Sequence, residues 1–279
     1  MIKISVIIAT YNRPDMLELV LKSLMVQCTG PGLAKSEVEV LVADDGSGAA
    51  TRELISKFQQ TFPFRLVHIW HEDQGFRLAA IRNLAITKAL GEYLIFIDGD
   101  CILARDFIYN QFKLSEPGYF VGGNRVLLSQ AYTLQVLASQ DISIASTNLV
   151  SAIMHKLKAH SNKWLPALRL NLNAKWRKAQ EYNWRRPKGC NMALWRTDCM
   201  RVNGFDESFS GWGHEDADFL VRLLHAGIKI KDGRFAVPVY HLWHPLQERS
   251  QESKNLQRLL SRVKDLSCIR AHQGLDQYQ

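Results

Sequence analysis

The chain has 279 residues, of which 47% are hydrophobic, and a formal net charge of +8 at pH 7. This length suits one large domain or two small ones, and the apolar content is ample for a hydrophobic core. The positive charge favours acidic partners, such as nucleotide phosphates, anionic lipids or nucleic acid, and does not by itself choose among them.

Cysteine usage and hydropathy narrow the setting. The five cysteines are scattered and form no C-x-x-C pair, so the sequence indicates neither a disulfide framework nor a zinc ribbon. No apolar run approaches the roughly 20 residues of a spanning helix, and the first apolar stretch is too short for a signal segment. We therefore expect a cytoplasmic protein without a membrane span.

The first hundred residues alternate apolar runs with amphipathic segments. Such an alternation of strand and helix predicts an α/β fold with a mostly parallel sheet and helices on both faces. Polar residues follow three of the strands, at Thr10, Asp44 and Asp98, and we expect them along one edge of the sheet. The expected strands are residues 2–9, 37–43, 65–70 and 93–97, and the expected helices are residues 14–27, 49–60 and 78–90.

The fourth strand ends in two carboxylates, Asp98 and Asp100, separated by Gly99. The strand is an unbroken apolar run, which is typical of a strand buried on both faces. Bare charges at its tip need a metal ion or cationic side chains close by. The alternative is a turn that two aspartates cap.

Four motifs in order, at residues 6–13, 43–47, 75–83 and 97–100, resemble the nucleotide-sugar half of a family 2 glycosyltransferase with the GT-A (Rossmann-like) fold. A later segment, residues 204–219, is similar to the acceptor-side motif of β-1,4-galactosyltransferases and of bacterial chondroitin-type polymerases. We accordingly expect a nucleotide-sugar half in residues 1–123 and an acceptor-binding half in residues 124–279 of one GT-A domain, although no clean boundary is visible.

The resemblance assigns roles to the donor side. Asp100 would ligate a metal directly, and Asp98 would contact the ribose or reach the metal through water. Asp45 and Tyr11 would hold uracil, which implies a UDP-sugar. Arginines at the start of a helix suit a diphosphate, although a surface role for them remains open. The expected donor-binding residues are Thr10, Tyr11, Arg13, Asp45, Arg77, Arg82 and Asp98.

The acidic cluster after Gly213 lies at the start of an expected helix. Asp216 precedes the apolar residues of that helix by three and four positions, which places it on the inward side. Asp218, four residues before Arg222, is most simply a surface ion pair.

By resemblance Asp216 is the general base, and Glu215 assists it by binding the acceptor sugar. The aromatic ring of Trp212 and the small Gly213 suit a sugar ring beside the backbone. A carboxylate base opposite the leaving group implies displacement with inversion. His214 stands where the galactosyltransferases usually have glycine.

Two histidines three residues apart, His241 and His244, close a later strand. Imidazole can complete a metal site begun by Asp100. By resemblance His244 is the better match to a ligand, whereas His241 is either a second ligand or a packed neighbour. Carboxylate and imidazole together suit Mn²⁺ as well as or better than Mg²⁺.

The middle of the chain is strongly basic. Residues 152–188 hold ten lysines and arginines against one acid, Glu181, with tryptophans among them. This pattern predicts an interfacial helix pair at an anionic membrane or a surface for an anionic acceptor, with an ordinary solvated basic face as the alternative. No nucleic-acid fold signature accompanies it, so nucleic acid is not an expected partner. Residues 246–267 are expected to form a closing helix.

Together these features predict an inverting, metal-dependent glycosyltransferase that acts on a glycan or glycolipid acceptor, with a role in bacterial surface polysaccharide such as lipopolysaccharide or capsule. The rival interpretations are a nucleotidyltransferase that binds sugar nucleotides and a non-catalytic GT-A binding subunit. Against the first, the loop after the first strand contains no glycine.

Overall fold

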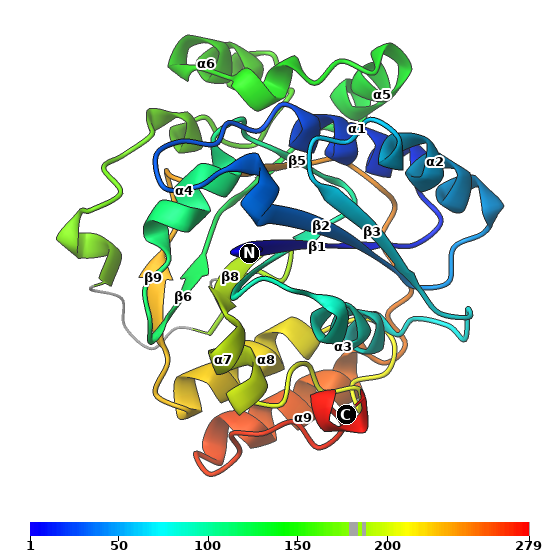
Figure 1. The fold of residues 1–279 in the computed structure, drawn as a ribbon, viewed down its shortest axis with the longest axis vertical. Helices are drawn as coiled ribbons and strands as arrows, with labels where there is room; N and C mark the ends of the chain where they lie inside the picture. Colours follow the sequence, from blue (N-terminus) through cyan, green and yellow to red (C-terminus); the bar gives the residue numbers. More distant parts are fainter. Residues whose placement is uncertain (179–183, 186–187, 279) are drawn as a thin grey trace.

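The computed structural model describes residues 1–178, 184–185 and 188–278. Within this part of the chain, seven strands form the main sheet in the order β3-β2-β1-β4-β8-β6-β9 (Figure 1). The sheet is mixed and mostly parallel, as expected: β8 alone runs antiparallel to its neighbours β4 and β6. Its strands are β1 (Ile4–Thr10), β2 (Val38–Asp44), β3 (Arg65–Trp70), β4 (Tyr93–Asp98), β6 (Tyr119–Gly122), β8 (Asn191–Trp195) and β9 (Lys229–Asp232).

A small second sheet continues from the end of β4. It contains β5 (Cys101–Leu103), β10 (Val239–His241) and β7 (Arg125–Leu127), with β10 in the middle. His241 pairs with Cys101 across the antiparallel β10–β5 ladder. This pairing brings the histidines of the second half of the chain to the aspartates at the tip of β4.

Helices cover both faces of the main sheet. Alternate side chains of β1 point to opposite sides: Ile4, Val6 and Ile8 enter one core and Ile7 enters the other. The first core is covered by α1 (Pro14–Met25), α2 (Ala49–Gln59) and α4 (Phe107–Leu114), and the second by α3 (Leu78–Lys88), α7 (Arg196–Arg201) and α8 (Glu215–His225).

Two further layers lie outside these helices. The helix α9 (Glu252–Lys264) packs on α8 at the bottom of Figure 1. At the top, α5 (Gln130–Ser139) and α6 (Leu149–Leu157) lie beyond α1, and α5 packs on the second sheet through Tyr132 and Val136. The second half of the chain therefore supplies both outer layers.

The expected elements of the first hundred residues are confirmed to within a few residues at each end. The strand expected over residues 65–70 coincides with β3, and the run at β4 is buried from Tyr93 to Ile97. The expected closing helix is shorter than residues 246–267, because α9 begins only at Glu252.

The expected interfacial helix pair in residues 152–188 is wrong for the described part of that segment. One α-helix, α6, is followed by short 3-10 turns, η3 (Leu165–Leu168) and η4 (Lys175–Lys178). Arg177 is fully buried, and its guanidinium donates to the carbonyls of Leu170, Asn171, Asp232 and Arg234. It is therefore a structural residue that satisfies a loop backbone. Residues 179–183 and 186–187 lie outside the described residues, and no described helix is long and apolar enough to cross a bilayer.

Candidate active site

Three parallel strands end side by side at one edge of the sheet. In the registers of β1 with β2 and β4, Thr10 lies opposite Asp44, and Ala9 lies opposite Asp98. The expectation that Thr10, Asp44 and Asp98 share an edge is confirmed. The loops after these strands then line a common cavity.

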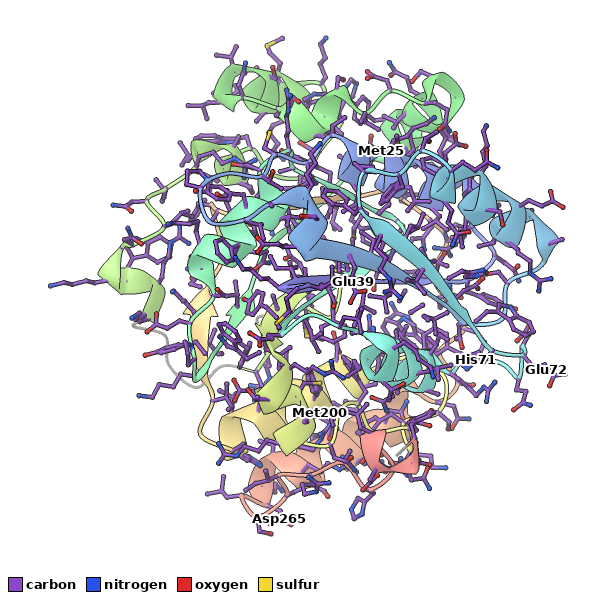
Figure 2. All side chains as sticks on the ribbon, in the orientation of Figure 1. Met25, Glu39, His71, Glu72, Met200 and Asp265 are labelled. Atoms are coloured by element: carbon purple, nitrogen blue, oxygen red, sulfur yellow. The ribbon has the colours of Figure 1, made fainter. Side chains whose placement is uncertain are left out.

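Asp45 lies at this edge and is 5% exposed. Its Oδ1 is 2.6 Å from Nε2 of His71, which follows β3 (Figure 2), and its Oδ2 accepts from the backbone N–H of Arg77 at 2.9 Å. Burial raises the pKa of Asp45 despite these two donors. The neighbouring Asp44 caps the loop, as one interpretation anticipated, since it accepts from the backbone N–H of Ser47 at 2.8 Å.

Tyr11 is 44% exposed, and its hydroxyl donates to Asp73 Oδ2 at 2.8 Å. The side chain of Arg77 donates to the carbonyl of Glu72 at 2.6 Å. Arg77 thus contacts Asp45 through its backbone, and its side chain lines neither of the two large cavities.

Arg82 is a buried link between the two halves of the chain. It is 1% exposed, and its guanidinium lies 2.9 Å from Asp98 Oδ1 and 3.5 Å from Glu215 Oε1. A surface role for Arg82 is therefore excluded. Burial outweighs this one cation, so the pKa of Asp98 rises to about 6 and that of Glu215 to about 7.

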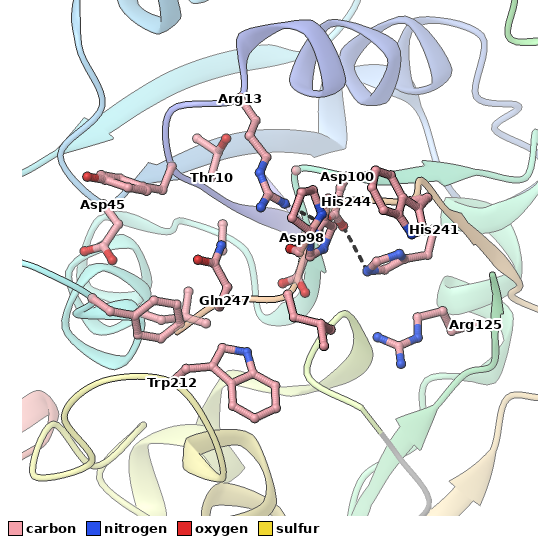
Figure 3. Close-up of a pocket in the computed structure, with 18 of the residues that line it drawn as sticks. Thr10, Arg13, Asp45, Asp98, Asp100, Arg125, Trp212, His241, His244 and Gln247 are labelled. Carbon is pink, nitrogen blue, oxygen red and sulfur yellow. Dashed lines mark hydrogen bonds and ion pairs between the residues drawn. The ribbon is translucent and has the colours of Figure 1, made fainter. Parts of the chain in front are cut away.

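Asp100 faces two imidazoles and a guanidinium (Figure 3). Its Oδ2 is 3.1 Å from His244 Nε2 and 3.6 Å from Arg13 Nη1, and its Oδ1 is 3.6 Å from His241 Nε2. Burial alone would raise the pKa of Asp100, but the hydrogen bond from His244 and the charges of both histidines hold it below its ordinary value. The pKa of His244 is raised by the same hydrogen bond, and burial lowers that of His241.

These side chains fit a divalent cation. One ligand atom each from Asp100, Cys101 and His241 lies within 4.8 Å of the other two. His244 adds a fourth donor, because its Nδ1 lies 2.7 Å from the carbonyl of Pro245 and its Nε2 faces Asp100. Burial raises the pKa of the Cys101 thiol, and carboxylate and imidazole groups suit Mn²⁺ better than a thiol does. Asp98, in contrast, pairs with Arg82.

Asp216 lies at the first turn of α8, where backbone N–H groups hold its carboxylate. Its Oδ2 accepts from Gly189 at 2.8 Å, and its Oδ1 accepts from Ala217 at 2.7 Å. These two hydrogen bonds fix the position of the carboxylate. The side chain is half-buried at the wall of a cavity, whereas its neighbour Glu215 is buried.

Two cavities meet at Asp98 and Trp212. The first, of about 530 Å³, contains the ends of β1, β2 and β4 together with His241 and His244. The second, of about 570 Å³, contains Arg82 and the start of α8. Every expected site residue except Arg77 lines one of them. The members of the first are Thr10, Tyr11, Arg13, Asp45, Asp98, Asp100, Trp212, His241 and His244, and those of the second are Arg82, Asp98, Trp212, Gly213, Glu215 and Asp216.

Sequence reasoning missed Arg125. This residue begins β7 and lines both cavities and also a third, smaller one of about 320 Å³ (Figure 3). No carboxylate of the described residues forms an ion pair with it. The Gly-Gly-Asn run that precedes it is a signal for a turn, but only the pairing of β7 with β10 shows where the turn leads.

The expected surface pair of Asp218 and Arg222 is wrong. Both side chains are fully buried, and Asp218 Oδ2 lies 2.8 Å from Arg222 Nε. Arg262 of α9 binds Asp218 at 2.7 Å and Asp206 at 2.8 Å. The helix α9 covers a face of α8 that the local sequence suggested was exposed.

Two family models and several known proteins match this chain. The family described as "Glycosyl transferase family 2" matches residues 5–167, and "N-terminal domain of galactosyltransferase" matches residues 173–245. The chain is 26% identical to a chondroitin synthase of Escherichia coli, covering 89% of this chain and 36% of the relative. It is also 26% identical to a validoxylamine A glucosyltransferase of Streptomyces hygroscopicus subsp. limoneus, covering 83% of this chain and 50% of the relative.

The chain therefore spans about a third to a half of the length of these relatives. Among solved structures, S. aureus TarS 1-349 in complex with UDP matches with a TM-score of 0.61 at 14% identity, over 99% of this chain and 68% of that chain. GalNAc-T7 with UDP, GalNAc and Mn²⁺ matches with a TM-score of 0.61 at 14% identity, over 94% of this chain and 48% of that one. At this identity the likeness shows the fold, which is GT-A.

Proposed function

Because this chain belongs to glycosyl transferase family 2, we propose that it transfers a sugar from a UDP-sugar to a hydroxyl of a glycan or lipid-linked glycan, with inversion at the anomeric carbon. One observation carries the proposal: the cavity that contains Asp100, His241 and His244 meets, at Asp98 and Trp212, a second cavity that contains Asp216. A donor in the first cavity would present its anomeric carbon at this junction.

The first cavity suits a nucleoside diphosphate. Asp45 would accept from the uracil N–H, the exposed ring of Tyr11 would stack on the base, and Thr10 and Arg13 would complete the donor contacts. The proposed metal ligands are Asp100, His244 and His241, and Asp98 would bind the ribose or a metal-bound water. A bound Mn²⁺ or Mg²⁺ would stabilise the departing diphosphate.

Two arginines, Arg13 and Arg125, would add positive charge beside the diphosphate to that of the proposed metal ion. Arg13 lies 3.6 Å from Asp100, and Arg125 lies at the border of both cavities without an ion pair to any described carboxylate. Their guanidiniums would neutralise charge that develops on the leaving oxygen. Arg82 would act through Asp98 and Glu215, which it holds in place, since it is too deeply buried and paired to grip a phosphate freely.

The second cavity suits the acceptor. Asp216 would take the proton from the acceptor hydroxyl as its oxygen forms a bond to the anomeric carbon and the bond from that carbon to the diphosphate oxygen breaks. Trp212 and Gly213 would face the acceptor sugar, and Glu215 would hydrogen-bond its hydroxyls. The products are the extended glycan, UDP and a proton held by Asp216.

We assign this activity to the assembly of a bacterial surface polysaccharide on the cytoplasmic side of the membrane, with peripheral attachment. The similarity to a chondroitin synthase supports polysaccharide synthesis, and the basic middle segment supports a nearby anionic surface. The donor sugar and the acceptor are to be found by experiment.

The decisive experiment screens UDP-sugars and glycan acceptors for release of UDP in Mn²⁺ by the wild-type protein. We expect Asp216→Asn to reduce transfer by about 10²–10⁴-fold, the range for a lost general base, while UDP binding measured by calorimetry is kept. Asp100→Ala should lose both transfer and Mn²⁺-dependent UDP binding. Asp276→Asn, a change at a half-exposed surface carboxylate, is the control.

Two outcomes would overturn the proposal. Binding of UDP-sugars without any turnover by the wild-type protein, with glycan acceptors supplied, would indicate a binding subunit. Full transfer by Asp216→Asn would move the base elsewhere, with Glu215 as the next candidate because it lines the same cavity.

A further inference from the structure

The helix α6 exposes apolar side chains. Among its nine residues, only Ala152 is buried. Val150 is 71% exposed and Leu157 is 75% exposed. The other large apolar side chains that α6 exposes are Leu149, Ile153 and Met154.

This apolar surface continues beyond α6. The helix packs against the turn η3, whose Leu165 and Leu168 are also exposed, and Leu134 of α5 is 57% exposed. Together α6 and η3 form what we call the α6 surface. Apolar groups gathered in this way on one surface mark a site of contact, whereas singly scattered ones need no explanation.

Positive charge surrounds the α6 surface. Lys156, Lys158 and Lys163 are exposed and form no ion pair within the described part of the chain. From residue 142 to residue 178 the sequence contains seven lysines and arginines and no acid. An apolar face flanked by free lysines is complementary to a surface that combines negative headgroups with a hydrocarbon interior.

We propose that the α6 surface docks this protein on an anionic lipid bilayer, with Val150 and Leu157 entering the headgroup region and the three lysines contacting anionic headgroups. The expectation for residues 152–188 is sharpened by this proposal. The docking helix begins before that segment, and Arg177 within it is a core residue.

The α6 surface is held against the proposed donor cavity. Asn162, just after α6, donates from its backbone N–H to the carbonyl of Leu127 at 3.0 Å and accepts from the backbone N–H of Leu127 at 2.9 Å. Leu127 and Leu128 line the first cavity, and Leu128 pairs with Ser161 in an isolated bridge. A docked α6 would therefore fix the height of this cavity above the bilayer. That this height would let a lipid-linked acceptor reach the cavity rests on the proposed function. The docking itself does not rest on it.

The test is co-sedimentation of the full chain with lipid vesicles. We expect binding to vesicles of phosphatidylcholine with phosphatidylglycerol and at least about tenfold weaker binding to phosphatidylcholine alone. The double variant Val150→Glu with Leu157→Glu should reduce binding to the anionic vesicles by at least about tenfold. Lys156→Gln, Lys158→Gln and Lys163→Gln together should remove the preference for anionic lipid and its sensitivity to salt.

The matched control is Leu266→Glu, which places a carboxylate at a leucine that is 70% exposed and far along the chain from α6. It should bind anionic vesicles as the wild type does. Circular dichroism and transfer to a water-soluble acceptor should be unchanged in all these variants, because none of the substituted residues lines either large cavity.

Equal binding of the wild type and the Val150→Glu, Leu157→Glu variant would overturn the proposal. The absence of any vesicle binding by the wild type would also overturn it. In that case, a concentration-dependent dimer that forms in the wild type and is lost in the Val150→Glu, Leu157→Glu variant would identify the α6 surface as a protein interface. Vesicle binding needs no catalysis, so docking without transfer would refute the proposed function alone, and transfer without docking would refute this inference alone.

Discussion

The first turn of α8 divides two charged clusters that differ in their balance of charge. Glu215 and Asp216 face the proposed acceptor cavity, while Asp218, two residues later, enters a closed cluster beneath α9. We call the first the open cluster (Arg82, Asp98, Glu215 and Asp216) and the second the closed cluster (Asp206, Asp218, Arg222 and Arg262). The same short stretch of sequence thus supplies both.

The closed cluster balances two carboxylates with two guanidiniums. Asp218 contacts both arginines, and Arg262 also contacts Asp206. Burial alone would raise the pKa of Asp206, but hydrogen bonds from Ser208 and from the backbone of His272, together with the charge of Arg262, lower it to about 2. The carboxylates here are satisfied, so the cluster holds α8 to α9.

The open cluster has three carboxylates and one guanidinium, Arg82. The pKa of Asp98 rises to about 6 and that of Glu215 to about 7, because burial is compensated by only one cation. This deficit of positive charge sits next to the proposed metal ligands. Between these two clusters, the pKa is raised for Asp98 and Glu215, where one cation faces three carboxylates, and lowered for Asp206, where the charges balance.

The largest expected effect tests the closed cluster. Asp218→Ala leaves two buried arginines with one carboxylate, and we expect it to lower the free energy of unfolding by about 3–5 kcal/mol, the range for breaking a buried ion pair. Urea unfolding followed by circular dichroism measures this loss.

The matched control is Asp276→Ala, which removes a pair with Arg270 whose side chains are more than half exposed. It should cost under about 1 kcal/mol. If both variants lost the same small amount, Asp218 would behave as the surface residue that the sequence first suggested, and the distinction between the two clusters would be lost.

The second effect concerns the open cluster and its pH dependence. The folded protein holds the Glu215 proton more tightly than the unfolded chain does, because the pKa is raised from 4.5 to about 7. Raising the pH from about 4 to about 8 therefore removes stability from the wild type, and Gln at this position does not titrate. Relative to wild type, Glu215→Gln should gain about 3 kcal/mol over this range.

Thermal melts of the two proteins at several pH values measure this gain as a growing difference in Tm. Groups that titrate alike in both proteins cancel in the difference. A difference in Tm that stays constant from pH 4 to pH 8 would show that Glu215 ionises normally, and the deficit of positive charge assigned to the open cluster would be contradicted.

Sequence reasoning located the polar edge of the main sheet because the polar residues there directly follow apolar strands. Once β1, β2 and β4 are parallel neighbours, the side chains after Thr10, Asp44 and Asp98 must gather at one edge. That step needs only the periodicity of each segment and the rule that parallel strands end together.

What the sequence could not show depends on contacts between distant segments. The burial of Asp218 follows from α9, which lies about 40 residues further along, and that of Arg177 from the loop after β9. Arg125 could not be placed, because β7 is three residues long and gains its position only by pairing with β10. Local patterns report which face is apolar, and they do not report what covers the polar face.

The smallest effect lies at the border between the clusters. His214 precedes α8 with a φ of +72°, in the left-handed region that favours glycine. Its Nε2 is buried, has no hydrogen-bond partner in the described structure, and belongs to a side chain that lines the second cavity. Here the chain keeps backbone strain together with an unsatisfied polar atom.

Two substitutions separate these contributions. His214→Gly and His214→Ala both remove the imidazole, but only glycine relieves the backbone, so His214→Gly should be more stable than His214→Ala by about 1 kcal/mol in urea unfolding. Because the His214 side chain lines the proposed acceptor cavity, both variants should raise the KM for the acceptor equally and leave the KM for the donor unchanged. Equal stability of the two variants would show that residue 214 is not held in the left-handed conformation in solution, and the strain would then be absent from the start of α8.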